Sequence, residues 1–249
     1  MRALIVIPCY NECERLLPVH VRELLSDPKV DILFVNDGSR DRTFLLLKKL
    51  SALHPGRIQV LDFEFNAGKA EAVRKGLLHA LEAGAELTGY TDADFATPPT
   101  ELLRLIDEIE HSGAEIVLGS RVALLGTTIK RSAIRHIVGR LFASVASFAV
   151  GSPIYDTQCG AKFFRTTSAL RAALAKPFSS RWAFDVELLC RLFGRLESSV
   201  STSFTHAREV PLRQWCDVPG SKLSFVSMAK SFTDVVLIWL RVERYARTR

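Results

Sequence analysis

The first 120 residues alternate between short apolar runs and stretches in which apolar residues recur every three or four positions. A short apolar run bounded by turn residues predicts a buried strand, and a spacing of three to four predicts an amphipathic helix. The predicted strands cover residues 3–8, 31–36, 58–63, 86–91 and 115–119, and the predicted helices cover residues 14–25, 43–53, 70–83 and 99–111. Strands that alternate with helices in this way predict an α/β fold with a doubly wound, mostly parallel sheet.

The alternation stops after Arg121. Residues 130–150 form a predicted helix with apolar side chains on one side. Its four basic side chains lie mostly on the remaining surface of that helix. Such a helix is typical of a segment in a membrane interface, and a core-packing helix with a solvated face has the same pattern. The other elements predicted here are strands at 160–164 and 200–206 and helices at 167–174, 184–193 and 224–241. The basic residues that follow the last helix form either a second lipid contact or a solvated chain end.

The net charge of +6 is unevenly distributed along the chain. Residues 1–120 carry a net charge of −6, residues 121–184 carry +9, and the remainder carries +3. This asymmetry predicts an anionic partner for the middle of the chain, such as nucleic acid, lipid headgroups or a phosphorylated substrate. Nucleic acid is the least favoured of these, because the basic residues lie among apolar ones rather than among exposed aromatic side chains.

The cysteines and the N-terminal sequence indicate the cellular compartment in which the protein works. The five cysteines are odd in number and show no C-x-x-C spacing, which argues against a disulfide scaffold or a zinc site and fits a reducing, cytosolic setting. The N-terminal residues lead directly into a predicted strand and do not resemble a signal peptide. No apolar run approaches the roughly 18 residues that a spanning helix needs, so we expect the chain not to cross a bilayer.

Two carboxylates, Asp92 and Asp94, follow one predicted strand and precede a predicted helix. Open α/β sheets bind ligands at the carboxyl ends of their strands. Because Mg²⁺ and Mn²⁺ are commonly held by one or two carboxylates together with substrate phosphates, this position suits a metal-bound nucleoside diphosphate. A simpler alternative is that Asp94 and Thr97 only cap the helix that begins at Pro98 or Pro99.

Three more polar corners follow other predicted strands, at residues 7–12 (Ile-Pro-Cys-Tyr-Asn-Glu), 35–39 (Val-Asn-Asp-Gly-Ser) and 66–69 (Asn-Ala-Gly-Lys). Together with the two aspartates, this arrangement resembles the family 2 glycosyltransferases of GT-A fold, which are Rossmann-like. Within them it is most similar to the polyprenyl-phosphate glycosyltransferases, first the dolichyl-phosphate β-glucosyltransferases and then dolichyl-phosphate mannose synthase. The resemblance covers nearly the whole chain, and its later motifs lie at residues 119–121, 156–165, 181–189 and 220–223.

The resemblance implies a division of the chain by function. Residues 1–120 correspond to the nucleotide-sugar-binding half of a GT-A domain, and residues 121–223 correspond to the acceptor-binding half with its basic amphipathic helix. Residues 224–249 correspond to a C-terminal amphipathic helix with a basic tail. Activity then requires Mg²⁺ or Mn²⁺ and a nucleotide sugar, with UDP-glucose as the first choice.

The resemblance also implies roles for individual residues. The base and ribose of the donor would contact Pro8, Tyr10, Glu12 and Asp37. Asp92 would support the ribose and the metal shell, Asp94 would bind the metal, and Lys69 and Lys222 would lie near the diphosphate. An Arg fork suits phosphate oxygens, so the acceptor's phosphate would be held from among Arg121, Arg131 and Arg135.

Asp185 falls where many inverting enzymes of this fold keep a general base. A phosphate monoester has a second pKa of about 6 and is already largely ionised at neutral pH, so it attacks without losing a proton to the protein. We therefore expect Asp185 and Glu187 to orient the acceptor or the neighbouring Arg181 and Trp182. With a sugar hydroxyl as acceptor, Asp185 would instead be a true base.

Three features depart from the family's pattern. Asn36 stands where a second Asp is more usual, Glu71 replaces a small residue after the Gly68-Lys69 turn, and the transmembrane segment that relatives often carry is missing from the chain. Attachment to a membrane would have to depend on the amphipathic helix and the basic surface.

The leading hypothesis is an inverting transfer of glucose from UDP-glucose to a polyprenyl phosphate of dolichyl or undecaprenyl type, by a peripheral protein at the cytosolic membrane face. The alternatives are GDP-mannose as donor and a soluble family 2 enzyme that acts on a sugar hydroxyl. A sugar nucleotidyltransferase is disfavoured because its glycine-rich opening loop is absent from residues 5–10. A non-catalytic binding module is disfavoured because Asp94 is retained.

Overall fold

The computed structural model describes residues 1–130, 133–197, 200–218 and 225–248, and it leaves undescribed the side chains at 130, 133–138 and 225–229. A seven-stranded sheet runs through the molecule in the order β3-β2-β1-β4-β7-β5-β8. Its strands are β1 (Ala3–Cys9), β2 (Val30–Asp37), β3 (Ile58–Phe63), β4 (Leu87–Tyr90), β5 (Ile116–Ser120), β7 (Lys162–Arg165) and β8 (Ala207–Pro211). Only β7 runs antiparallel to its neighbours in this sheet, so the predicted mostly parallel α/β fold is confirmed.

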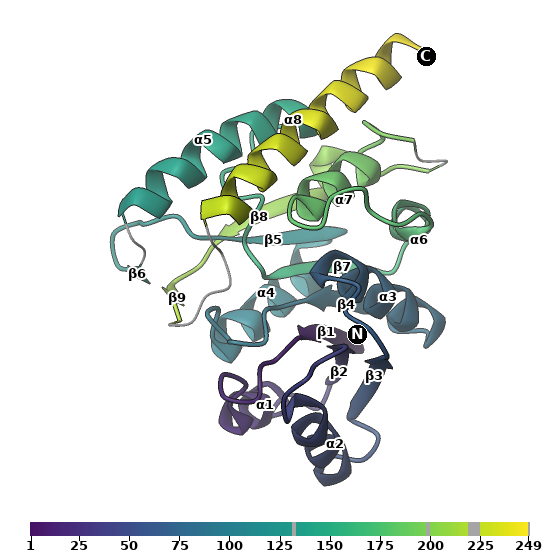
Figure 1. The fold of residues 1–249 in the computed structure, drawn as a ribbon, viewed down its shortest axis with the longest axis vertical. Coiled ribbons are helices and arrows are strands. Elements are labelled where there is room, and N and C mark those ends of the chain that lie inside the picture. The colour runs from purple at the N-terminus through teal and green to yellow at the C-terminus, as the bar shows by residue number, and fades with distance from the viewer. Residues whose placement is uncertain (131–132, 198–199, 219–224, 249) are drawn as a thin grey trace.

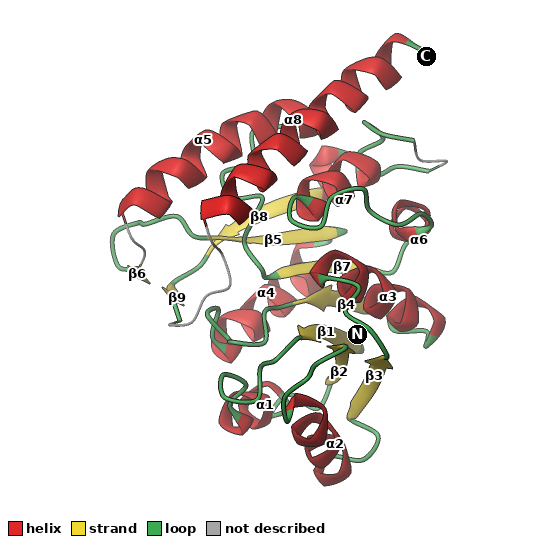
Figure 2. Cartoon of the chain, viewed as in Figure 1, coloured by secondary structure: helices red, strands yellow, loops and turns green. Residues whose placement is uncertain are grey.

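Helices cover both faces of the sheet (Figures 1 and 2). One face packs against α1 (Pro18–Leu24), α2 (Thr43–Leu53) and α4 (Pro99–Ser112), and the other packs against α3 (Lys69–Glu82), α5 (Ala133–Val150), α6 (Ser168–Leu174), α7 (Phe184–Leu192) and α8 (Phe225–Arg247). Successive side chains of a strand point to opposite faces, so β1 sends Leu4 and Val6 into one core and Ile5 and Ile7 into the other. A strand buried on both faces reads as a continuous apolar run, which is how β1 appears in the sequence.

The register of the sheet aligns the carboxyl ends of three strands. Cys9 of β1 lies beside Asn36 of β2, and Asn36 lies beside Asp62 of β3. Strand β4, on the other side of β1, ends at Tyr90 and leads directly into Asp92 and Asp94. The polar corners that follow these strands therefore meet at one edge of the sheet.

The second half of the chain completes the same sheet rather than forming a separate layer. Strand β7 lies between β4 and β5, and β8 extends the sheet beyond β5. A short two-stranded ribbon of β6 (Thr128–Lys130) and β9 (Gln214–Cys216), which the sequence did not predict, lies apart from the main sheet. Helices α5 and α8 pack against each other over this half of the molecule (Figure 1).

Three predicted elements differ from the structure. The last helix, predicted to end at residue 241, continues to Arg247, so Arg244 and Arg247 lie within α8 and not in a chain end after it. The strand predicted at 200–206 is wrong: residues Phe204–His206 form a 3-10 helix, η1, in which the Ser203 side chain accepts a hydrogen bond from the Thr205 amide, and the strand begins at Ala207. The helix predicted from residue 14 begins at Pro18, a residue suited to the first turn of a helix. Among the described residues, no helix has both the length and the apolar character needed to cross a membrane.

Candidate active site

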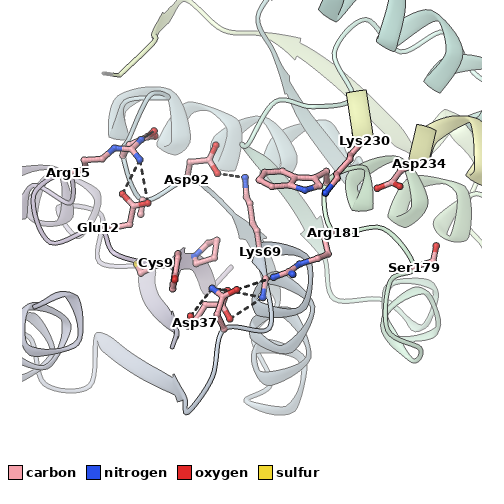
Figure 3. A pocket seen from close by; sticks show the side chains of 17 residues that line it. Cys9, Glu12, Arg15, Asp37, Lys69, Asp92, Ser179, Arg181, Lys230 and Asp234 are labelled. Atoms are coloured by element: carbon pink, nitrogen blue, oxygen red, sulfur yellow. Dashed lines mark hydrogen bonds and ion pairs between the residues drawn. The ribbon is translucent and has the colours of Figure 1, made fainter. Parts of the chain in front are cut away.

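A cavity of about 730 Å³ opens at the carboxyl edge of the sheet. Each of the four predicted polar corners contributes to its wall, and the loop between α6 and α7 and the N-terminal half of α8 close it from the other side (Figure 3). Its predicted lining residues are Pro8, Tyr10, Glu12, Asp37, Lys69, Asp92 and Asp94. The structure therefore brings together all the described residues that the sequence assigned to the donor and the metal.

Asp37 binds the loop between β3 and α3. Its two carboxylate oxygens accept hydrogen bonds from the backbone amides of Ala67 (2.7 Å) and Gly68 (2.9 Å) and from the Asn66 side chain (3.0 Å). Burial raises the pKa of Asp37, while these amides and the nearby Arg181 act in the opposite direction. Asp37 thus orders the loop that carries Lys69 in addition to facing the cavity.

Asp92 pairs with Lys69, whose ammonium group donates a hydrogen bond to the Asp92 carboxylate. Burial acts to raise the pKa of Asp92, but Lys69, Lys162 and Arg121 together outweigh it and leave that pKa below its usual value. Gly160 passes directly behind this carboxylate, since a Cβ atom at Gly160 would lie 2.3 Å from Asp92 Oδ2. The backbone at residue 160 therefore lies closer to Asp92 than it could if residue 160 had a side chain.

Asp94 binds Arg15, a contact that the sequence did not predict. The Arg15 guanidinium donates to the Asp94 carboxylate and also lies within 3.4 Å of Glu12. Burial and the neighbouring charge of Asp92 raise the pKa of Asp94, against the lowering effect of Arg15 and Lys69. Two carboxylates that repel each other in one cavity favour a cation between them.

The donor set fits a divalent metal that the substrate helps to bind. Among the residues with described side chains, no group of three His, Cys, Asp or Glu residues could hold an ion by itself. Asp92 and Asp94 supply two oxygen ligands, and Mg²⁺ or Mn²⁺ ordinarily takes its remaining ligands from substrate phosphates and water. Lys69 and Arg15 neutralise these carboxylates in the structure, which shows that the pair requires positive charge.

The alternative role of Asp94 and Thr97 as helix caps receives no support. Pro98 is the N-cap of α4, and within the described part of the chain no side chain caps this helix. Asp94 Oδ1 instead accepts a hydrogen bond from the Ala96 amide at 3.1 Å. Between them Phe95 adopts a positive φ of 50°, which is unusual for an aromatic residue and marks a strained turn at this corner.

A second cavity, of about 250 Å³, adjoins the first. Its lining shares Lys69, Asp92, Asp94, Arg181 and Trp182 with the first cavity. Its other walls come largely from α5, α8 and the loop after α5, and they include the side chains of Phe142, Ala143, Thr157, Gln158, Phe184 and Phe232. The two cavities therefore meet at the predicted metal ligands, and the second adds the aromatic rings of Phe142, Phe184, Trp215 and Phe232 to its wall.

Arg121 lies in the wall of the second cavity and is held by Asp156. Its Nε and Nη2 atoms donate to the two oxygens of Asp156 at 2.6 and 2.8 Å, and its guanidinium lies 5.3 Å from the centre of the Trp215 ring. Burial acts to lower the pKa of Arg121, but Asp156 outweighs it and raises that pKa. Arg121 thus remains a cation, with Nη1 left for a ligand. The side chains of Arg131, Arg135 and Lys222, predicted to contact phosphate groups, lie outside the described residues.

Asp185 also lines the second cavity, but its described partners are Tyr90 and Lys162 rather than Arg181 or Trp182. Lys162 donates to Asp185 Oδ1 at 2.6 Å and to the Cys159 carbonyl, and the Tyr90 hydroxyl donates to the same carboxylate oxygen. Burial and the Asp185 charge raise the pKa of Tyr90 well above its usual value. Two donors from the protein interior therefore occupy Asp185 Oδ1.

Glu187 is completely buried and lies outside the linings of both cavities. It accepts hydrogen bonds from the Ser179 amide at 2.9 Å and hydroxyl at 2.7 Å, and from Arg191 at 2.6 Å. These contacts fix the loop between α6 and α7. Glu187 therefore shapes the site through that loop.

Arg181 is the second residue at this site that the sequence did not assign to the donor. It extends from the α6–α7 loop across the first cavity, packs against Gly68, and donates to Asn66 Oδ1 at 3.0 Å (Figure 3). Gly68 has a φ of +94°, and a Cβ there would lie 2.5 Å from Arg181 Nε, so this close approach requires glycine.

The two departures from the family's pattern have local structural partners. Glu71 forms a bidentate contact with Arg74 at 2.7 and 2.8 Å, which neutralises the extra acidic charge near Lys69. Asn36 donates to Asp62 at 2.6 Å and is almost fully buried. Neither residue lines the first cavity.

Comparison with known proteins identifies the family of this chain. Residues 4–170 match the model of "Glycosyl transferase family 2". The chain is 35% identical over 256 residues to a dolichyl-phosphate beta-glucosyltransferase of Drosophila melanogaster (95% of this chain, 74% of that protein) and 30% identical over 204 residues to a polyprenol monophosphomannose synthase of Mycolicibacterium smegmatis (82% and 77%).

A solved structure is similar in fold. Glucosyl-3-phosphoglycerate synthase from Mycobacterium tuberculosis, in complex with Mn²⁺ and UDP-glucose, aligns over 97% of this chain and 78% of that chain with a TM-score of 0.67 and 16% identity. At that identity the likeness concerns the fold alone. The family model covers well over half of the chain and two relatives are at least 30% identical over most of it, so the chain belongs to glycosyltransferase family 2 and is a glycosyltransferase.

Proposed function

We propose that this enzyme transfers glucose from UDP-glucose to a polyprenyl phosphate, with inversion at the sugar's C1 atom. The observation that carries the proposal is that two cavities meet at Asp92 and Asp94, and that the second also has Arg121 and several aromatic rings in its wall. One is lined by the polar corners of the sheet edge and suits a nucleotide. The other runs against α5 and α8, has aromatic and aliphatic walls, and contains Arg121, which suits an amphiphilic phosphate.

In this proposal the first cavity binds the donor. Pro8, Tyr10, Glu12 and Asp37 surround the base and ribose, and Lys69 lies near the diphosphate. Asp92 and Asp94 hold a Mg²⁺ or Mn²⁺ ion, which supplies positive charge to the departing diphosphate when bound. Lys69 and Arg15 neutralise these carboxylates in the structure, so binding the metal requires Arg15 to move away from Asp94.

The reaction needs no protein base. A non-ester oxygen of the acceptor's phosphate forms the new bond to C1, the bond between C1 and the UDP oxygen breaks, and UDP leaves with that electron pair. The acceptor is already ionised near neutral pH. This chemistry leaves Asp185 a positioning role, and its Oδ1 atom already accepts hydrogen bonds from Lys162 and Tyr90.

The relatives support both the donor and the acceptor class. The similar proteins of Drosophila melanogaster and Saccharomyces cerevisiae are named dolichyl-phosphate beta-glucosyltransferases, and the chain covers 95% and 94% of its own length in these alignments. The polyprenol monophosphomannose synthase aligns over a smaller share of this chain, 82%. Glucose is therefore the first choice of sugar, and GDP-mannose is the alternative donor.

We further propose that the enzyme works at the surface of a membrane, on the cytosolic side. Leu141 and Phe148 of α5 and Leu237, Trp239 and Leu240 of α8 are exposed, although α8 already buries its other apolar side in the core. A helix that is apolar on two sides is stable only if both sides are shielded from water, so the exposed side of α8 needs an apolar partner. The basic residues at the end of α8 add attraction to anionic headgroups.

The proposal is tested by offering four radiolabelled donors to the enzyme with a polyprenyl phosphate: UDP-glucose, UDP-galactose, UDP-N-acetylglucosamine and GDP-mannose. We expect label to enter the lipid phase from UDP-glucose in the presence of Mg²⁺ or Mn²⁺. EDTA and the Asp94→Asn variant should each abolish the transfer. Asp107→Asn, an exposed change on α4, is the matched control and should leave transfer unchanged.

The outcomes separate the alternatives. Labelling only from GDP-mannose would identify GDP-mannose as the donor and leave polyprenyl phosphate as the acceptor. No lipid labelling from any donor, despite metal-dependent binding of UDP, would refute the phosphate acceptor. A sugar hydroxyl with Asp185 as base would then be the next acceptor to test.

A further inference from the structure

Two residues in the wall of the second cavity each have a buried polar atom without a hydrogen-bond partner in the described part of the chain. The Thr157 hydroxyl and the Gln158 side-chain nitrogen are buried and make no hydrogen bond among the described residues. Thr157 is 1% exposed. Buried polar groups are nearly always paired in folded proteins, and a group left unpaired costs stability, so two consecutive exceptions in one cavity wall require an explanation.

The segment that carries them is rigidly held. Glu209 of β8 accepts hydrogen bonds from the backbone amides of Tyr155 (2.8 Å) and Asp156 (2.7 Å). Asp156 in turn binds Arg121 through both carboxylate oxygens and accepts a hydrogen bond from the backbone N–H of Gln158 at 3.2 Å. The unpaired groups therefore do not result from a loose loop, because these contacts hold the backbone that carries them.

The unpaired groups can act as hydrogen-bond donors, and the cation beside them has donor capacity left. A hydroxyl and a side-chain amide nitrogen each donate, and Arg121 has Nη1 left after its contact with Asp156. Three donors, one of them charged, match the oxygens of a phosphate group better than a neutral ligand. Four acidic residues of this wall have basic partners: Asp92 binds Lys69, Asp94 binds Arg15, Asp156 binds Arg121 and Asp185 binds Lys162.

The rest of the cavity wall indicates what the phosphate is attached to. Phe142 of α5 and Phe232 of α8 make an edge-to-face contact with ring centres 5.8 Å apart, and both rings line the cavity. A phosphate bound by Arg121 would therefore have aromatic and aliphatic side chains beside it, which suit a hydrocarbon chain better than a second polar group.

We propose that Thr157 and Gln158 bind the phosphate group of the acceptor, together with Arg121, and so select a phosphate monoester over an alcohol. The inference rests on the proposed function for the nature of the reaction and adds the residues that recognise the acceptor. A bound phosphate would supply the missing partners of both side chains. Without it their burial lowers the stability of the free enzyme.

The test uses Thr157→Val and Gln158→Glu, which keep the shape of each side chain. Thr157→Val removes the donor, and Gln158→Glu replaces the donor with a negative charge that repels phosphate. Gln59→Glu makes the same change at an exposed position of edge strand β3 and is the control. For each protein we would measure kcat and KM with farnesyl phosphate, UDP binding by calorimetry, and the melting temperature.

We expect the KM for farnesyl phosphate to rise about 10-fold or more in both variants, as for loss of a hydrogen bond to a charged group. UDP binding should be unchanged, because neither residue lines the first cavity. The melting temperature of Thr157→Val should be equal to or above that of the wild type, because an unpaired buried hydroxyl has been removed. A purely structural role predicts the opposite change in melting temperature with an unaltered KM.

Unchanged KM values in both variants, with normal transfer by the wild type, would refute the inference and leave the proposed function intact. If the wild type transfers sugar to no lipid phosphate, the proposed function fails instead. In that case binding of glycerol 3-phosphate, compared with glycerol, tests the site directly: binding that both variants weaken supports a phosphate site for a soluble acceptor, and binding that neither variant weakens refutes it.

Discussion

Lys162 and Asp185 form an ion pair at 2.6 Å in the interior of the protein, where the side chain of Lys162 is 0% exposed and that of Asp185 is 7% exposed. Strand β7 supplies the lysine and α7 supplies the aspartate, so the pair joins the central sheet to the helical layer beside the second cavity. A buried pair of this kind is costly to break, because removing one partner leaves the other charge buried and uncompensated.

Replacing the lysine tests this relationship. We expect Lys162→Met to lower the free energy of unfolding by about 3–5 kcal/mol, the usual cost of leaving one member of a buried ion pair alone. Urea denaturation measures the effect. Lys176→Met is the matched control: its pair with Glu197 is on the surface, with side chains 74% and 69% exposed, and its loss should leave stability unchanged. Equal stabilities for the two variants would contradict the burial of the Lys162 pair.

The role of Asp185 in turnover follows from the same contacts. With a polyprenyl phosphate as acceptor, we expect Asp185→Asn to slow the reaction by less than the factor of about 10²–10⁴ that a general base contributes. The rate should be measured well below the melting temperature of the variant, because the change also leaves Lys162 without its charged partner. A loss of about 10²-fold or more in folded protein would identify Asp185 as a base and the acceptor as a hydroxyl.

The first half of the fold could be predicted from the sequence for a physical reason. Strands buried on both faces appear as continuous apolar runs. In the helices between them, apolar residues recur every three or four positions, as expected when one side of a helix is buried. The helix at residues 43–53 and the strand at 58–63 have the predicted bounds. Because parallel strands share one carboxyl edge, the order of strands and helices along the chain was enough to assign the polar corners to one site.

The contacts inside the site could not be predicted, because their partners are distant in the sequence. Arg15 binds Asp94 from 79 residues away, and Arg181 reaches Asn66 from 115 residues away. Neither arginine lies in a polar corner of the sheet. The strand predicted at 200–206 failed for a different reason: β-branched and aromatic residues are common there, but Val200 and Phe204 are exposed and no sheet face covers them.

Gly160 offers a test of how closely the chain must approach Asp92. A methyl group added by Gly160→Ala would lie 2.3 Å from Asp92 Oδ2, so the carboxylate has to move. We expect Mn²⁺ affinity in the presence of UDP to fall by about 10-fold or more, as for other changes beside a metal ligand. Gly119→Ala, whose nearest contacts would be 3.2 Å, is the control. Equal Mn²⁺ affinity in the Gly160 variant and the wild type would contradict a metal role for Asp92.

The five cysteines should divide into two classes by reactivity. Cys216 is exposed and Cys13 is partly exposed, whereas Cys9, Cys159 and Cys190 are buried. Burial raises the pKa of Cys159 to about 11 and that of Cys190 to about 12, so the reactive thiolate is scarce at pH 8. We expect a thiol reagent to modify two cysteines in the native protein and five after denaturation. Rapid modification of a third cysteine under native conditions would contradict this packing.

The membrane proposal makes the most direct prediction about the surface of the molecule. Leu237 and Leu240 are 53% and 49% exposed on the outer side of α8, beyond the buried positions Val235 and Ile238. The double change Leu237→Glu and Leu240→Glu should leave the fold intact, because neither side chain is in the core. It should abolish flotation with vesicles that contain anionic phospholipids, since two carboxylates would have to enter an anionic, apolar interface.

The control for this experiment is Leu45→Glu. Leu45 is 68% exposed on α2. Helices α2 and α8 pack against opposite faces of the sheet. If α8 is the attachment surface, Leu45→Glu should float with the vesicles as the wild type does. Trp239 provides a second measurement, because its fluorescence should shift to shorter wavelength when vesicles bind the wild type and not the double variant. Flotation of the double variant at the wild-type level would exclude α8 as the surface that contacts lipid, and the exposed residues of α5 would then have to carry the attachment alone.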